Sequence, residues 1–392
     1  MDISFHYYAI KVLSIGAGFD EADAQIISQY SQFVDDYNQF NAMRLTNVPE
    51  YASHLTVFGL FNPVTTGFQG IDNAWFTNDR YRRRILTPFH FIPEKQLLPG
   101  NAPPRVKAYC PETGADTLLH SMLEQARAKY RYAKGNAALK KEALMRIGML
   151  LHIFADTYSH QEFSGGWGWE NESKLVHVQI GEGHGVTREV TGDYHAGKFH
   201  QLPSIGHANV STAPDETAVC FTMKHHEDEK NAKYTETYSR NNTLTFLEAA
   251  RRIFEYLLTL SEQPALGGTI TDFSKISVRL ARAFSLYREK EESDQGYGRL
   301  LKEHWEKSTQ GLYSFPVSFH YNKNDVLNCP LSAVSSPMQA DTVGKAKTMT
   351  DDFYRYNVLA YEIRRAVTGE SNPMNGLETD EVQLLRDLAG KV

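Results

Sequence analysis

Residues 150–160 read LLHIFADTYSH, which places His152, Asp156 and His160 four residues apart within an apolar run. Residues at positions i, i+4 and i+8 of a helix lie in one stripe that drifts by about 40° per step, so the three side chains should point the same way. The neighbouring Leu, Ile, Phe and Ala residues indicate that this stripe faces a core or a cleft, where a carboxylate must be paired or bound to a metal. Two imidazoles and a carboxylate on one rigid helix predict a zinc site, and the alternative is a helix whose polar face merely holds these residues.

The composition is typical of a soluble globular protein of one or two domains, with 392 residues, 41% of them hydrophobic and 22% charged. A formal net charge of −6 argues against a general nucleic-acid binder. Cys110, Cys220 and Cys329 form no C-x-x-C pair, so a metal site must be built from histidines and carboxylates. Residues 1–6, MDISFH, show no cleavable signal peptide, and no apolar run is long enough to span a membrane. We therefore expect a cytoplasmic protein, or one exported without such a signal.

Helical spacing of apolar residues recurs along the chain and predicts mainly helices. The expected helices cover residues 5–14, 22–33, 117–134, 137–158, 245–260, 276–290 and 353–367. Residues 41–105 are rich in Pro, Gly and aromatics, and residues 164–214 are rich in Gly and His, so both segments are expected to be long irregular loops. The sequence thus predicts an all-α fold, a single large helical domain over residues 1–392. Its metal-site motifs lie within residues 1–250, and further helices from residues 251–392 pack on it.

Several polar residues outside the central helix are further candidate ligands. Asp35 and Asp36 end an expected helix, where carboxylates oppose the macrodipole and a cation would stabilise them. His90 is enclosed by apolar neighbours and binds either a metal or a backbone carbonyl. His184 and His207 adjoin glycines, which permit close approach of the backbone to a metal.

Other polar residues are less constrained by their neighbours. His6 lies on the first expected helix, next to an aromatic pair of tyrosines. Asp215 follows Pro214 and is either a ligand or a turn residue. His225 and His226 precede an acidic run and are expected on a solvated face.

The order of these residues resembles the zinc-dependent phospholipase C and single-strand nuclease superfamily. Within it, several short segments are most similar to a divergent branch that includes phosphatidylcholine-hydrolysing phospholipases C of the pseudomonad type. These segments are FHYY at 5–8, QFVDD at 32–36, FHFIP at 89–93, IGH at 205–207 and PD at 214–215. The matching motifs extend from His6 to about residue 250.

The resemblance implies an all-helical fold around two or three zinc ions at the bottom of a cleft. It implies that Asp156 bridges two ions, and that the ligands are His6, Asp36, His90, His152, Asp156, His160 and His207. The family's amino-terminal tryptophan ligand is not matched, because this chain begins Met1-Asp2. Its later H-x-x-x-E motif is also absent, since Glu189 follows His184 by five residues, so Asp215 or Glu189 would replace that glutamate.

Such a cluster predicts phosphodiester hydrolysis. Zinc ions neutralise the phosphodiester charge and lower the pKa of a shared water to about 7, which gives a nucleophile at neutral pH. Asp36, or Asp35, is a candidate for orienting this water as well as binding metal, and Asp156 is the second candidate catalytic residue.

The expected substrate is a phospholipid at a membrane surface. Phosphatidylcholine is favoured, because an acidic chain is repelled by anionic bilayers. Trp167 and Trp169 stand in a glycine-rich segment and are candidate substrate-binding residues. They would meet a lipid surface or enclose a choline cation, although they are also suited to stacking on bases or covering the core. A single-strand nuclease and a non-catalytic metal-stabilised scaffold are the alternatives.

Overall fold

The computed structural model describes residues 1–39, 42–67, 82–98, 100–183, 186–195, 204–226, 234–261, 272–289, 293–328 and 347–370, together with residues 383 and 386. The chain divides into two compact units. The first unit comprises Met1–Gln32, His90–Glu94 and Pro103–Tyr321. The second unit comprises Phe33–Phe89, Lys95–Ala102 and Asn322–Val392.

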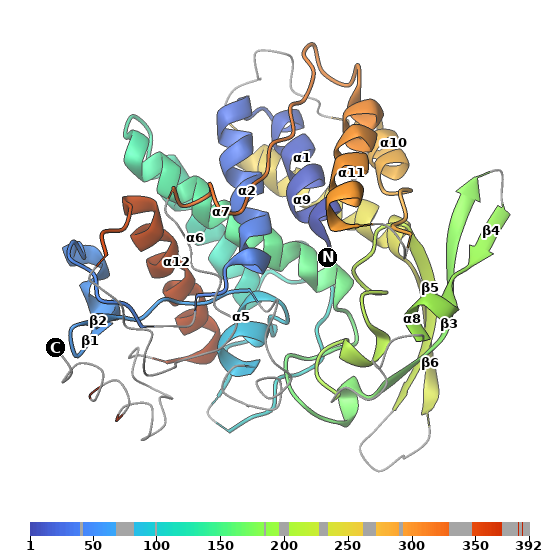
Figure 1. The fold of residues 1–392 in the computed structure, drawn as a ribbon, viewed down its shortest axis with the longest axis horizontal. Coiled ribbons are helices and arrows are strands. Elements are labelled where there is room, and N and C mark those ends of the chain that lie inside the picture. Colours follow the sequence, from blue (N-terminus) through green and yellow to red (C-terminus); the bar gives the residue numbers. More distant parts are fainter. Residues whose placement is uncertain are drawn as a thin grey trace. The chain divides into compact units, whose positions relative to one another are not determined.

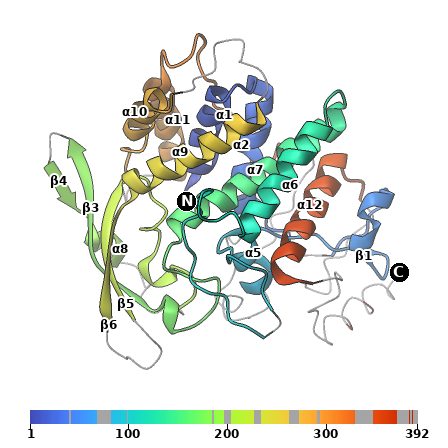
Figure 2. The same cartoon turned by 180° about the vertical axis from the view of Figure 1, so that it is seen from behind.

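Helices make up most of the first unit (Figure 1). They are η1 (Ser4–Ala9), α1 (Ile10–Gly16), α6 (Leu118–Tyr132), α7 (Ala137–Ser159), η4 (Trp169–Asn171), α8 (Thr191–His195), η6 (Ala208–Val210), α9 (Asn242–Leu260), α10 (Ser274–Ala283) and α11 (Asp294–Thr309). Helix α2 (Glu21–Asp36) begins in the first unit and ends in the second. Helix α7 packs against both α6 and α9, and the three helices lie side by side in Figures 1 and 2.

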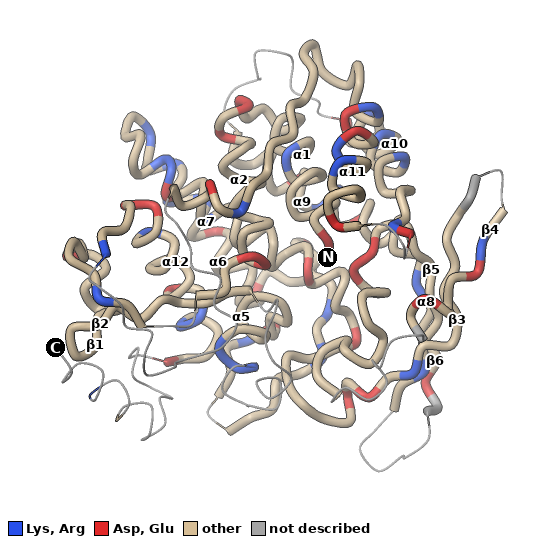
Figure 3. Tube along the Cα trace, in the orientation of Figure 1, with Lys and Arg blue, Asp and Glu red and all other residues tan. Residues whose placement is uncertain are grey.

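The sequence of α7 explains its central place in the first unit. Asn136 caps its first turn by accepting a hydrogen bond from the backbone N–H of Leu139, and every residue from Ala143 to Ser159 is buried. The charged residues of α7 other than Asp156 lie in its first half (Figure 3). The second half is therefore an apolar, well-packed support for one carboxylate.

The first unit also holds an antiparallel sheet, so the prediction of an all-α fold is wrong. Strands β3 (Ser173–Gly183), β4 (Val186–Glu189), β5 (Val219–His226) and β6 (Tyr234–Asn241) pair in the order β4-β3-β5-β6. The prediction of one long loop over residues 164–214 is wrong for the same reason, because β3, β4 and α8 lie within it. Along β5 the buried residues alternate with less buried ones, as expected of a strand that covers a core on one face.

The second unit is built around α12 (Asp351–Thr368), which packs against α5 (Thr87–Phe89), η3 (Arg82–Leu86) and η2 (Glu50–Leu55). Strands β1 (Thr56–Val57) and β2 (Leu60–Phe61) form a second, two-stranded antiparallel sheet. Its core is aromatic: the rings of Tyr37 and Tyr356 lie 4.8 Å apart, and Asn357 donates a hydrogen bond of 2.9 Å to the Tyr37 hydroxyl.

Most predicted helices are confirmed within these units. The expected helices at 117–134 and 137–158 are α6 and α7, and those at 245–260 and 353–367 are α9 and α12. Helix α10 ends at Ala283, well before the expected residue 290, and α11 was not predicted. No helix in the ranges given above is long and apolar enough to cross a bilayer.

Candidate metal centre

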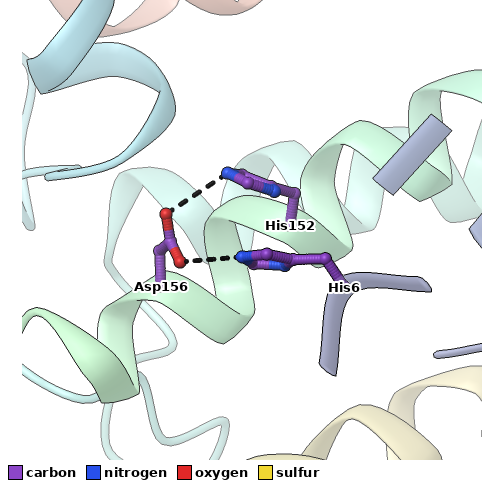
Figure 4. Close-up of side chains that lie close together, drawn as sticks. All are labelled: His6, His152 and Asp156. Carbon is purple, nitrogen blue, oxygen red and sulfur yellow. Dashed lines mark ion pairs between the residues drawn. The ribbon is translucent and has the colours of Figure 1, made fainter. Parts of the chain in front are cut away.

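The last turn of α7 carries Asp156 at the centre of a group of imidazoles. Asp156 Oδ1 lies 3.1 Å from His6 Nε2, and Oδ2 lies 3.2 Å from both His152 Nε2 and His90 Nδ1. His6 comes from η1, a π-helical segment of the kind often found at functional sites, and Figure 4 shows its ring beside His152 and Asp156. Three imidazole nitrogens thus meet one buried carboxylate, and we call these four residues the Asp156 group.

The donor atoms of the Asp156 group are spaced as metal ligands are. His152 Nε2 and His90 Nδ1 lie 3.3 Å apart. Two ligands of a tetrahedral zinc, with bonds of about 2.0–2.1 Å, are themselves about 3.3 Å apart. His6 Nδ1 has no hydrogen-bond partner among the described residues, and its Nε2 meets only Asp156 Oδ1 at 3.1 Å, although the ring is fully buried and stacks on His152 at 3.9 Å. A buried polar atom without a partner is costly, and a metal ion would satisfy it.

A second group adjoins the first and consists of His160, His207 and Asp215. His160 Nε2 lies 3.0 Å from Asp215 Oδ1, and His207 Nε2 lies 3.1 Å from Asp215 Oδ2. We call these residues the Asp215 group. His160 Nδ1 is 3.7 Å from Asp156 Oδ2, so the two groups share a border.

The hydrogen bonds of the Asp215 group set the tautomers of its histidines. His160 Nδ1 donates to the His90 carbonyl at 2.6 Å, and His207 Nδ1 donates to the Ser211 carbonyl at 2.7 Å. In a neutral imidazole the other nitrogen, Nε2, then carries a lone pair. That lone pair faces a carboxylate oxygen, which is favourable when a proton or a metal ion lies between them. A carbonyl that orients a ligating imidazole in this way is the usual outer shell of a metal site.

Each carboxylate is held in its ionised form. Burial alone would raise the pKa of Asp156, but the amino group of Met1 and the imidazoles of His160, His152 and His6 together hold it well below 3.8. The Met1 nitrogen lies 2.6 Å from Asp156 Oδ1 and 3.2 Å from Asp215 Oδ1. Burial would likewise raise the pKa of Asp215, and His207, this amino group and His160 lower it well below 3.8.

The buried histidines are held in their neutral form. Burial lowers the pKa of His152 to about 4, and Asp156 only partly opposes the shift. Burial also lowers the pKa of His6 and of His207. Neutral imidazoles and ionised carboxylates are the protonation states that bind metal, so these groups require little proton release.

The structure brings together most of the candidate ligands. The residues that meet in the two groups are His6, His90, His152, Asp156, His160, His207 and Asp215. His160 departs from the predicted stripe, because α7 ends at Ser159 and His160 is its C-cap. Its Nε2 therefore turns to Asp215, while His152 faces Asp156.

Two of the remaining candidate ligands, Glu189 and His184, are not placed in either group. Glu189 is half-exposed on β4 and pairs with His177 on the neighbouring strand, so of the two later carboxylates only Asp215 lies in a candidate metal group. His184 falls outside the described residues. Asp35 and Asp36 end α2 in the second unit, where burial raises the pKa of the Tyr356 hydroxyl and both carboxylates add to that shift.

The two tryptophans differ in exposure. Trp167 is 53% exposed, whereas the guanidinium of Arg105 lies 5.5 Å from the ring of Trp169. The glycine-rich segment is held by Asn171, whose amide donates to the carbonyls of Ser164 and Gly166. Trp167 is thus an exposed aromatic on an ordered frame.

His225 and His226 are not on a solvated face, so that prediction is wrong. They end β5 with exposures of 1% and 7%. The backbone carbonyl of His226 accepts a hydrogen bond of 2.8 Å from Arg105. In the sequence these two histidines stand directly before a run of charged residues. The polar character of that run masks the fact that β5 continues to His226.

The pKa shifts predict how the stability of the metal-free protein depends on pH. The unfolded chain binds protons at its histidines below pH 6.5, whereas folded His152 does so only near pH 4, so stability is lost as pH falls through this window. His152 alone should cost about 2 kcal/mol between pH 7 and pH 5. Asp156 and Asp215 keep their contribution to stability throughout this window. That contribution is lost only in stronger acid, because their pKa values in the folded protein lie well below 3.8.

Urea unfolding of the chelator-treated protein at pH 7 and pH 5 measures this loss. The variant His152→Gln lacks this titrating group, so the free energy of unfolding should depend less on pH, by about one proton taken up on unfolding. Equal stability of the metal-free protein at the two pH values would contradict the buried neutral state of these histidines.

Comparison with protein families gives one match, to a family described as a family of unknown function (DUF6765), over residues 1–371. No curated protein and no solved structure matches the chain.

Proposed function

The chain belongs to the DUF6765 family, whose function is unknown, and from the metal centre we propose that it is a zinc-dependent phosphodiester hydrolase that acts on phospholipids as a phospholipase C. The observation that carries this proposal is the pair of adjoining groups around Asp156 and Asp215. Two adjacent metal ions are the arrangement that clamps the attacking and leaving oxygens of a phosphodiester.

The residues present suit a substrate with one negative charge. When bound, zinc polarises phosphoryl oxygens and lowers the pKa of water to about 7. The donors of the two groups are neutral imidazoles and the carboxylates of Asp156 and Asp215, so the charge of two divalent ions would exceed that of these two carboxylates by about 2. Burial of Asp156 and of the histidines around it excludes water and strengthens this attraction.

The position of Trp167 supports a lipid substrate. The backbone of Trp167 pairs with that of Ile205, and Gly168 N–H donates to the Ser204 carbonyl, so this segment lies beside the one that carries His207. An exposed tryptophan favours the interfacial region of a bilayer. A lipid that meets Trp167 would thus be close to the Asp215 group.

The distribution of charged residues on the first unit supports the single-strand nuclease alternative less well than the phospholipase. Figure 3 shows acidic residues among the basic ones on α11, whereas α10 carries basic residues alone and is too short for a basic track by itself. Single-strand binding normally uses a positively charged groove lined by aromatic residues. We therefore propose a zwitterionic phospholipid, with phosphatidylcholine first, as the substrate.

The direct test is hydrolysis by one preparation that is stripped of metal and then restored with zinc. Phosphatidylcholine vesicles, a soluble phosphorylcholine ester and single-stranded DNA are the three substrates. Zinc-dependent release of diacylglycerol and phosphorylcholine is the expected result. Cleavage of DNA alone would favour a nuclease, and zinc binding without turnover on any substrate would favour a metal-stabilised scaffold.

Trp167→Ala should separate lipid binding from chemistry. We expect hydrolysis of vesicles to fall by about 5- to 10-fold, since an interfacial tryptophan contributes on the order of 1 kcal/mol of binding, while the soluble ester is cleaved at the original rate. Tyr132→Ala, at an 84% exposed aromatic that ends α6, is the matched control and should change neither rate. Equal losses on both substrates would place Trp167 in the fold instead.

A further inference from the structure

Arg240 is a buried cation at the end of β6 that contacts the backbone beside both metal groups. It is 7% exposed. Its Nη1 donates to the carbonyls of Tyr158 and Ser159 at 2.8 Å each, and its Nη2 donates to the Pro214 carbonyl at 2.6 Å. One guanidinium thus joins the last turn of α7 to the residue before Asp215.

Asn242 extends these contacts to the other side of Asp215. Its Oδ1 accepts a hydrogen bond of 2.8 Å from Arg240 Nε, and its Nδ2 donates to the carbonyls of Ala213 and Glu216 at 2.7 Å each. The carbonyls on both sides of Asp215 are therefore fixed by Arg240 and Asn242. We call the two residues the Arg240 clamp.

The chemistry of the Arg240 clamp requires a guanidinium. The carbonyls of Tyr158 and Ser159 belong to the last turn of α7, where helix carbonyls lack intrahelical partners and the dipole favours a cation. The planar fork of arginine carries donors on three separate nitrogens, which here reach four acceptors, whereas the three donors of lysine share a single nitrogen. The rings of Phe221 and Phe246 lie 4.9 and 6.0 Å from the guanidinium carbon, which leaves little room for water in its place.

We propose that Arg240 and Asn242 are positioning residues that fix Asp215 relative to His160, so that the Asp215 group binds its own metal ion. His160 follows Ser159 directly and Asp215 follows Pro214 directly, so the clamp holds the residue next to each ligand. The Asp156 group needs no such bridge for His152 and Asp156, because both stand on α7. The inference rests on the metal binding of the proposed function and not on its substrate.

The test is zinc stoichiometry and affinity in Arg240→Lys, which keeps the charge and loses the fork. The wild-type protein should bind two equivalents of zinc. Arg240→Lys should keep one equivalent at wild-type affinity and bind the other about 10- to 100-fold more weakly, as expected when an outer-shell partner is lost. Asp215→Asn should weaken the same equivalent, which identifies it as the ion of the Asp215 group.

Matched variants keep the test decisive. Arg251→Lys, at a half-buried arginine on α9, is the control and should bind zinc as the wild type does. Should Arg240→Lys fail to unfold cooperatively, Asn242→Ala, which removes the amide bonds to Ala213 and Glu216, must show the same selective loss.

The possible outcomes separate the two proposals. Full affinity for both equivalents in the clamp variants, or equal weakening of both, would overturn the positioning role while leaving the hydrolase proposal intact. Two tight equivalents in the wild type without hydrolysis of any phosphodiester would overturn the hydrolase alone. A wild type that binds no zinc would overturn both.

Discussion

Asp156→Asn should remove the zinc ion of the Asp156 group and lower phosphodiester hydrolysis by at least about 100-fold. The two carboxylate oxygens of Asp156 face His6, His90 and His152. Asparagine keeps the shape of the side chain but removes its negative charge and one acceptor oxygen. Loss of a direct ligand should exceed the 10- to 100-fold cost that outer-shell substitutions carry.

Zinc content per chain and the rate on a soluble ester measure this effect together. Asp116→Asn makes the same chemical change at an exposed turn and should leave both values unchanged. Full zinc occupancy in Asp156→Asn would contradict the assignment of Asp156 as a ligand.

Gly148→Ala should destabilise the protein by about 1–3 kcal/mol, the usual cost of overpacking a close contact. Helix α7 meets α2 at Gly148, where a Cβ atom would lie 2.4 Å from the Ile27 carbonyl oxygen and 3.1 Å from Ser31 N. These are backbone atoms, so the helices themselves must move apart. Since Gly148 lies one turn before His152, the displacement should also weaken zinc binding by the Asp156 group.

Gly298→Ala is the control for this substitution. Gly298 lies within α11, and a Cβ atom there meets nothing within 4 Å. Alanine should therefore stabilise the helix by up to about 1 kcal/mol, through its higher helix propensity. Chemical unfolding measures both variants, and a Gly148→Ala protein as stable as the wild type would show that α7 and α2 do not pack this closely.

The helical part of the centre could be predicted because its spacing is local. His152 and Asp156 stand four residues apart on α7, and this spacing fixes their common face whatever the rest of the chain does. His160 did not follow the stripe, because a helix end depends on what satisfies its last carbonyls. Here Arg240 donates to two of them although it lies 82 and 81 residues further along the chain, which no local pattern can show.

The sheet was missed although part of it has a clear signal. Residues 219–224 alternate Val219, Phe221 and Met223 with more polar residues, which is the pattern of a half-buried strand. The glycines and histidines of residues 164–214 and the charged run after His226 outweighed this signal. The residue composition of a segment is an average over its whole length. A strand needs only a few alternating apolar and polar residues and a neighbouring strand to pair with.

The choice of Asp215 over Glu189 required tertiary structure. Both follow the central helix, and neither has the spacing of a known motif. Glu189 pairs with His177 across β3 and β4, while Asp215 is fixed by hydrogen bonds to the neighbouring carbonyls. Since every residue has a carbonyl, such bonds leave no trace in the sequence.

The candidate metal centre consists of imidazole nitrogens and carboxylate oxygens, without a thiolate among its donors in the described residues. Oxidants that convert thiolates to disulfides or sulfinic acids therefore have no target in these two groups. Metal loading should persist in oxidising and in reducing surroundings alike. Nitrogen and oxygen donors bind Cu²⁺ more tightly than Zn²⁺, so the ion carried in a cell would be set by which metal is supplied rather than by the preference of the site.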